Sequence, residues 1–233
     1  MNILITGGPA YEPLDEVRTL TNCATGKTAV TLAKHFLKKG HKVWIFLGTL
    51  SKYSLSSQTN LVVERFGTNE ELARLLEAAA KESSVEAVFH TAALCDFRVG
   101  QIWNQKGEPV PHRLKLPSQA VYHVELVPLP KVINRLADWF PGAMRVGWKF
   151  EVTGDRVSSL QRAVQQVVET RSHFCVLNGR GYGEGYGVVG PEGLRRHARD
   201  VQALAEILED FLIHWGRPED AIGNQDPERK PSC

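Results

Sequence analysis

The first 37 residues place an apolar run, a glycine pair and an amphipathic helix close together. Residues 2–5 (NILI) are followed by Thr6-Gly7-Gly8-Pro9, a pattern typical of a buried strand in a parallel sheet. After a polar loop, Thr25-Gly26-Lys27 opens a helix with apolar residues at helical spacing, which are Val30, Ala33 and Leu37. The first turn of a helix carries unpaired N–H groups and about half a positive charge, so it attracts anions. This stretch predicts the first half of a nucleotide-binding α/β unit.

The rest of the chain alternates between strand and helix patterns. Strands are predicted at 41–47, 61–63, 85–91, 144–150 and 174–177, and helices from residue 69, at 130–139, at 156–169 and at 195–215. Residues 179–187 (GRGYGEGYG) are predicted to form a loop. The alternation favours an α/β fold with a doubly wound, mostly parallel, Rossmann-like sheet. We expect one domain over residues 1–215 and a disordered tail over residues 216–233, which hold three prolines and many charges.

Residues 98–128 interrupt this rhythm, because they show no helical pattern. A connection of this length inside a compact domain is usually functional, so we expect a long basic β-hairpin flap. Residues 113–116 are predicted to pair with residues 121–126 across Pro117-Ser118-Gln119. The basic residues of the flap are Arg98, Lys106, His112, Arg113 and Lys115.

Unusual segments follow four of the predicted strands: Gly7-Gly8, residues 93–96, residues 147–151 and Asn178. In open parallel sheets, ligands bind outside the carboxyl ends of the strands, so these segments predict one shared site. Asp96 is expected to bind ribose hydroxyls, although it is also placed to cap a turn. Arg113 and Lys115 alternate with leucines and therefore face one side of a strand. They either stabilise phosphate charge or form a polar outer face.

Composition and motifs exclude several other classes. A net charge of +2 and 42% hydrophobic residues give no reason to expect nucleic-acid or membrane binding. No apolar run approaches the roughly 20 residues of a membrane span, no signal-like segment is apparent, and we expect a cytoplasmic protein. The four cysteines are scattered, which predicts reduced thiols and no His/Cys metal site. Gly26-Lys27 lacks the earlier glycine of a P-loop, and no G-x-G-x-x-G follows the first strand.

Three segments together resemble the phosphopantothenate–cysteine ligases, a family that in bacteria often forms the C-terminal half of a coenzyme A biosynthesis flavoprotein. The family pattern ITxGPTxEPxDxVRxxTNxSSGKxG corresponds to residues 5–27, ITGGPAYEPLDEVRTLTNCATGK. Residues 92–97 (AALCDF) are similar to the family's A-A-V-x-D-[FY], and residues 147–152 (GWKFEV) to its G-F-K-L-E-T. The similarity covers roughly residues 2–180 and leaves no room for a flavin-binding half.

The resemblance implies that a nucleoside triphosphate, CTP or ATP with Mg²⁺, activates the carboxylate of 4′-phosphopantothenate and that the amine of cysteine then attacks. It also implies a homodimer formed through the flap and a separate flavin-dependent decarboxylase acting on the product. The residues it makes catalytic are Asn22, Arg113 and Lys115. The residues it assigns to the nucleotide pocket are Gly7, Gly8, Pro9, Arg18, Thr25, Gly26, Lys27, Ala93, Asp96, Phe97, Trp148 and Asn178.

The chain departs from the family pattern in the flap. The family's K-[IL]-K-K is Arg113-Leu114-Lys115-Leu116 here, and its K-N-P-D-[IL] is replaced by residues 128–132, PLPKV. Arginine keeps the charge of lysine but cannot give up its proton. Two alternatives to a ligase therefore stay open at this point: an NAD(P)-binding Rossmann oxidoreductase and a non-catalytic nucleotide-binding relative.

Overall fold

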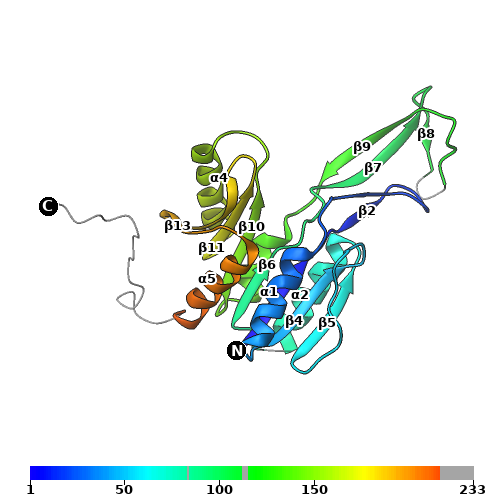
Figure 1. Ribbon diagram of the computed structural model, residues 1–233. Coiled ribbons are helices and arrows are strands. Elements are labelled where there is room, and N and C mark those ends of the chain that lie inside the picture. The colour runs from blue at the N-terminus through cyan, green and yellow to red at the C-terminus, as the bar shows by residue number, and fades with distance from the viewer. Residues whose placement is uncertain (83, 112–114, 216–233) are drawn as a thin grey trace.

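A computed structural model describes residues 1–82, 84–111 and 115–215. Within these residues, eight strands form one sheet in the order β13-β12-β11-β10-β6-β1-β4-β5, and the six from β11 to β5 run parallel (Figure 1). The bounds of the strands are β1 Asn2–Gly7, β4 Lys42–Gly48, β5 Leu61–Phe66, β6 Ala87–His90, β10 Met144–Phe150, β11 Phe174–Gly179, β12 Gly183–Gly190 and β13 Gly193–Ala198. The predicted doubly wound α/β sheet is confirmed.

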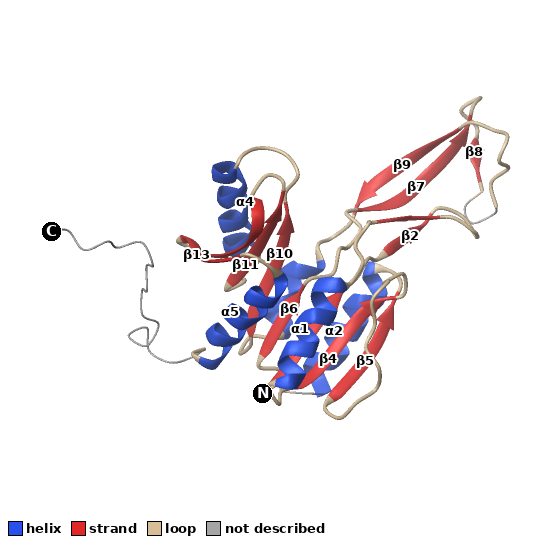
Figure 2. Ribbon diagram, viewed as in Figure 1, coloured by secondary structure: helices blue, strands red, loops and turns tan. Residues whose placement is uncertain are grey.

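Helices cover both faces of this sheet (Figure 2). One face packs on α1 (Lys27–Lys38) and α5 (Val201–Ile213), through a core that includes Ile3, Phe36 and Phe89. The other face packs on α2 (Asn69–Glu82), η1 (Val132–Arg135), α3 (Leu136–Trp139) and α4 (Arg156–Glu169). No helix of the described residues is long and apolar enough to cross a membrane.

Two predictions near the carboxyl-terminal end of the described chain are wrong. The helix predicted at 195–215 is strand β13 followed by α5, because Asp200 caps the later helix by accepting a hydrogen bond from Ala203 N at 2.8 Å. The loop predicted at 179–187 contains residues 183–187 of β12. Gly187 is needed because the Tyr182 ring lies against the strand: a Cβ there would lie 2.8 Å from the Tyr182 hydroxyl.

The flap projects from the edge of the sheet where the parallel strands end (Figure 1). It is a three-stranded antiparallel sheet of β7 (Phe97–Asn104), β8 (Pro109–Val110) and β9 (Tyr122–Pro128), in the order β8-β7-β9. The predicted pairing of 113–116 with 121–126 is wrong for its described part: β9 pairs with β7, and Lys115 and Leu116 lie outside strands. The pairing follows apolar contacts, since Val99, Ile102 and Leu116 form a small core inside the flap. Residues 112–114, and with them Arg113, lie outside the described residues, as does the predicted tail.

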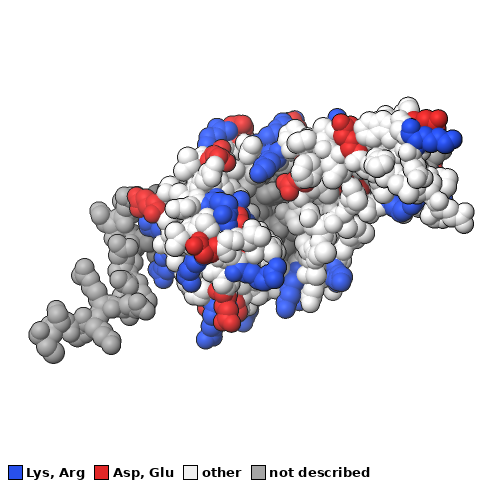
Figure 3. Space-filling model, turned by 90° about the horizontal axis from the view of Figure 1, so that it is seen from above, with Lys and Arg blue, Asp and Glu red and all other residues white. Residues whose placement is uncertain are grey.

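The acidic segment after β1 ties the flap to the domain. It forms a short hairpin, β2 (Tyr11–Pro13) with β3 (Thr19–Thr21), where the sequence suggested only a loop. Glu12 Oε1 accepts a hydrogen bond from Val99 N at 3.0 Å, and Asp15 Oδ2 accepts one from Leu116 N at 3.1 Å. The flap also carries two acidic residues, Glu108 and Glu125. From above, Lys and Arg side chains are interspersed with Asp and Glu (Figure 3).

Candidate active site

The loop after β1 and the segment after β6 are joined at the carboxyl edge of the sheet. Asn22 Nδ2 donates hydrogen bonds to the carbonyls of Ala93 at 3.1 Å and Leu94 at 2.9 Å. The backbones also pair, with Ala93 N donating to Gly8 O and Ala10 N donating to Ala93 O, each at 3.0 Å. The structure therefore brings together Gly8, Pro9, Asn22 and Ala93, which lie up to 85 positions apart in the chain.

Glycines allow α1 and a neighbouring loop to approach this junction. A Cβ on Gly7 would lie 2.1 Å from the Ala29 Cβ, so only glycine lets α1 pack this closely on β1. Gly8 and Gly26 have φ values of +76° and +79°, which residues with a Cβ rarely adopt. Ser51 fills the space between these two glycines, and its Oγ is buried without a partner among the described residues. The amino end of α1 thus lies beside Gly8, as predicted, with Ser51 inserted between them.

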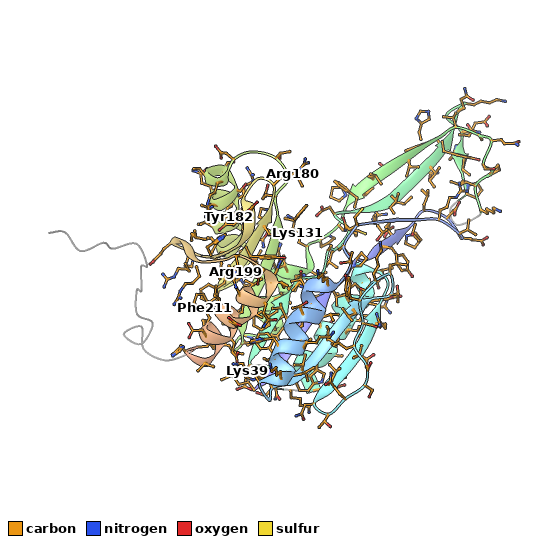
Figure 4. The ribbon with its side chains drawn as sticks, in the orientation of Figure 1. Lys39, Lys131, Arg180, Tyr182, Arg199 and Phe211 are labelled. Atoms are coloured by element: carbon orange, nitrogen blue, oxygen red, sulfur yellow. The ribbon has the colours of Figure 1, made fainter. Side chains whose placement is uncertain are left out.

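A cavity opens next to Asp96. Its volume of about 280 Å³ is near the lower limit for small-molecule pockets. Trp148, Phe150, Lys131 and Lys149 are among the residues that line it. Trp148 also packs on the core that faces α1 and α5, and Lys149 is paired with Glu151 at 3.6 Å. Figure 4 shows Lys131 beside the carboxyl ends of the central strands, at the base of the flap. The full lining is Asn69, His90, Ala92, Leu94, Cys95, Asp96, Leu129, Pro130, Lys131, Val132, Ile133, Trp148, Lys149, Phe150 and Gln166.

Two residues maintain the shape of this cavity. The amide of Asn69 binds the backbone of Cys95 twice, with Nδ2 donating to the carbonyl at 2.7 Å and Oδ1 accepting from the N–H at 3.1 Å. The segment that presents Asp96 is therefore anchored to the start of α2. Gly147 contributes by its small size, since a Cβ there would lie 2.7 Å from Ile133 Cδ1 and 2.9 Å from Gln166 Nε2.

A wider cavity of about 1180 Å³ separates the base of the flap from the domain. Its walls include Glu12, Asp15, Asn69 and Arg98. Burial raises the pKa of the Asp15 carboxyl, but hydrogen bonds from Val17 N, Leu116 N and Arg18 outweigh it and lower that pKa to about 2. The Arg18 guanidinium also donates to the Leu116 carbonyl. Arg18 therefore holds the flap through Asp15 and Leu116, rather than lining the cavity beside Asp96.

The remaining predicted residues that the structure describes are not among the lining residues of these two cavities. Phe97 begins β7 and is 45% exposed. The carbonyl of Asn178 accepts a hydrogen bond from Glu151 N at 2.8 Å, and that of Thr25 accepts one from Lys52 N at 3.0 Å. Lys27 and Lys115 are exposed. Of the predicted nucleotide-pocket residues, the smaller cavity brings together Asp96 and Trp148, with Ala93 next to its lining residues Ala92 and Leu94.

Sequence reasoning missed several lining residues, above all His90, Asn69, Lys131 and Lys149. The signal for His90 was available, because it is the polar last residue of an otherwise apolar strand. Among the described residues, no group of three or more His, Cys, Asp or Glu side chains is placed to hold a metal ion. Asp96 contributes the carboxylate of the smaller cavity.

Comparison with known families shows which family this domain belongs to. The profile of the DNA/pantothenate metabolism flavoprotein C-terminal domain family matches residues 1–187. The chain belongs to this family. The match ends inside β12, so β13 and α5 lie beyond it. The resemblance found in the sequence is thereby confirmed.

Curated relatives are longer proteins. The coenzyme A biosynthesis bifunctional protein CoaBC of Thermococcus kodakarensis is 29% identical over 176 residues, which are 76% of this chain and 40% of that protein. The protein of the same name from Methanocaldococcus jannaschii is 25% identical over 178 residues, with the same shares covered. This chain therefore spans about two fifths of the length of these relatives.

Solved structures share the fold at low sequence identity. The DNA/pantothenate metabolism flavoprotein from Streptococcus pneumoniae superposes with a TM-score of 0.81 at 19% identity, over 92% of this chain and 99% of that one. A mutant of Cab2, H337A, in complex with phosphopantothenate-cysteine, superposes with a TM-score of 0.71 at 19% identity, over 91% and 87% of the two chains.

Proposed function

We propose that this protein is a nucleotide-dependent acid–amine ligase of the phosphopantothenate–cysteine ligase type, acting in coenzyme A biosynthesis. The observation that carries the proposal is the junction at the sheet edge, where Asn22 binds the Ala93 and Leu94 carbonyls beside the cavity that contains Asp96. Family membership, the function named for the CoaBC relatives and the ligand named for the Cab2 structure support the same activity.

In this proposal the smaller cavity receives a nucleoside triphosphate, CTP or ATP. Asp96 binds the ribose hydroxyls and Trp148 contacts the base, while the phosphates extend toward Gly8 and the amino end of α1. Mg²⁺ usually keeps several waters and binds together with substrate phosphates, and we assign it no protein ligand, because Asp96 is assigned to the ribose. When bound, the ion would neutralise charge on the departing pyrophosphate.

The residues of the chain contribute position and charge to the two steps. The carboxylate of 4′-phosphopantothenate attacks the α-phosphorus, which forms an acyl-nucleotide and releases pyrophosphate. The amine of cysteine then attacks the acyl carbon and the nucleoside monophosphate leaves. Asn22 orders the loop that faces the reacting groups, and Lys131 and Lys149 supply fixed positive charge near the phosphates.

By resemblance the flap supplies the second half of the site, and we assign Arg113 and Lys115 to the amide-forming step. We also propose a homodimer formed through the flap, because exposed apolar side chains gather there: Phe97 at 45%, Val121 at 53% and Leu126 at 48% exposure. A separate flavin-dependent decarboxylase in the cytoplasm would then use the product.

A non-catalytic nucleotide-binding relative is the second candidate, favoured by the replacement of the family's flap lysine by Arg113. Pyrophosphate release distinguishes the two. The purified chain is incubated with each of the four nucleoside triphosphates and Mg²⁺, with and without 4′-phosphopantothenate and cysteine. A ligase releases pyrophosphate only when the acid is present, whereas a non-catalytic relative binds a nucleotide and releases none.

A further inference from the structure

His90 is a buried side chain at the cavity that the proposed reaction does not yet use. It is the last residue of β6, it is 5% exposed, and it lines the 280 Å³ cavity together with Asp96 and Trp148. Its neighbour on β1 is Thr6, which is paired with it in register. On the other side lies β10, where the absence of a side chain at Gly147 leaves room for the cavity residues Ile133 and Gln166.

The hydrogen bonds of Thr6 define which ring nitrogen of His90 carries the proton. Thr6 Oγ1 lies 2.8 Å from His90 Nδ1 and accepts a hydrogen bond from Ala92 N at 3.4 Å. A buried hydroxyl hydrogen needs an acceptor, and within the described part of the chain Nδ1 is the acceptor within reach. We therefore assign Nδ1 as the acceptor and place the proton on Nε2.

Nε2 points away from Thr6 and is left for a ligand. Among the described residues it has no hydrogen-bond partner, and His90 lines the cavity. Burial lowers the pKa of His90 to about 4, so the ring is neutral near neutral pH. His90 therefore presents one uncharged N–H donor to whatever occupies the cavity.

Resting on the proposed function, we infer that the Nε2–H of His90 donates to an acceptor atom of the nucleobase and thereby positions and selects the base. An uncharged single donor is suited to a ring nitrogen or carbonyl oxygen, whereas a phosphate is better matched by the charged Lys131 and Lys149 in the same cavity. A buried donor rejects bases that leave it unpaired, which makes His90 a specificity residue.

The test compares ligands with and without a base. Dissociation constants for CTP, UTP, ATP, GTP and inorganic tripolyphosphate are measured by calorimetry on the full chain and on His90→Phe, which keeps a ring but removes the donor. We expect the preferred nucleotide to bind roughly threefold to tenfold more weakly to the variant, since a neutral hydrogen bond contributes on that order. Discrimination among bases should shrink, and tripolyphosphate affinity should stay the same. His90→Gln, which restores an N–H donor, should recover part of the selectivity.

Other outcomes overturn the inference in distinguishable ways. Equal weakening of all five ligands, or weakening of tripolyphosphate, would mean that His90 supports the fold or the phosphates rather than the base. An unchanged order and ratio of nucleotide affinities in both variants would remove His90 from base recognition while leaving the proposed function intact. Absence of nucleotide binding by the wild-type chain would refute both.

Discussion

Asn22→Asp is the substitution that isolates the junction between the loop after β1 and the segment after β6. It keeps the size of the side chain and replaces a donor by an acceptor. Asn22 Nδ2 donates at 3.1 Å and 2.9 Å to two carbonyls, so the aspartate would place a negatively charged oxygen against two carbonyl oxygens. Repulsion should push the loop away from Ala93 and Leu94.

The size of the effect follows from the two hydrogen bonds. Each contributes about 0.5–1.5 kcal/mol, and the exposure of Asn22 favours the lower value, so the pair amounts to about 1 kcal/mol. For a chain of this length, 1 kcal/mol lowers Tm by about 2–4 °C. Catalysis should suffer far more than stability, because a displacement of about 1 Å at a reacting group can cost on the order of 100-fold in rate.

The assay combines thermal unfolding with pyrophosphate release in the presence of 4′-phosphopantothenate. Asn60→Asp is the matched control, because it makes the same chemical change in an exposed loop before β5, at a φ of +63° that aspartate tolerates. The control should retain both Tm and turnover. If Asn22→Asp loses the expected few degrees of Tm but turns over like the wild type, the junction is structural and the assignment of Asn22 is wrong.

Three further predictions concern the elements around the site. Gly8→Ala should lower the free energy of unfolding by about 1–3 kcal/mol, because alanine rarely adopts the positive φ at this position. The added Cβ would also lie 1.8 Å from Ser51 Oγ, so adding Ser51→Gly should recover part of the loss in chemical denaturation. If nothing is recovered, the clash with Ser51 does not contribute. The hydrogen bonds to the Asp15 carboxylate lower its pKa from 3.8 to about 2. The ionised carboxylate therefore stabilises the attached flap fully above pH 3.8, and this stabilisation is lost as the pH falls toward 2. Limited proteolysis of the flap should therefore accelerate over that range and be faster for Asp15→Asn at neutral pH; equal rates for variant and wild type would show that Asp15 does not hold the flap. Glu209→Ala should cost about 1–3 kcal/mol in urea unfolding, because it removes the 2.6 Å hydrogen-bond partner of buried His35 between α5 and α1. Glu206→Ala, on the exposed face of α5, should be nearly neutral, and similar losses in both variants would refute the pairing.

The meeting of Gly8, Asn22 and Ala93 was predictable because parallel strands end at one edge of the sheet. Alternating patterns identified the strands, and their topology brought the ends together regardless of sequence distance. The helix α4 could be predicted from the sequence equally well, since Asp155 and Ser158 form a capping box at its start and its apolar spacing is regular.

Features that depend on contacts between segments far apart in the chain could not be predicted from the sequence. The glycines of β12 resemble a loop in sequence, and the reason for Gly187, the Tyr182 ring packed on the strand, appears only in three dimensions. The sequence predicted a shorter hairpin, and the pairing of β7 with β9 that the structure has instead joins segments about 20 residues apart. The polar end of an apolar strand marks His90 in the sequence, but the orientation of its ring depends on Thr6, which the register places beside it from 84 positions away.

The location of the nucleotide is the central claim, and hydrogen exchange with and without saturating CTP or ATP and Mg²⁺ tests it most directly. Backbone amides of residues 7–10 and 92–97 should be protected by the nucleotide, together with those around Trp148, while β13 and α5 should exchange at unchanged rates. Protection confined to the flap or to the α5 side of the sheet, with none at residues 7–10 and 92–97, would contradict the account.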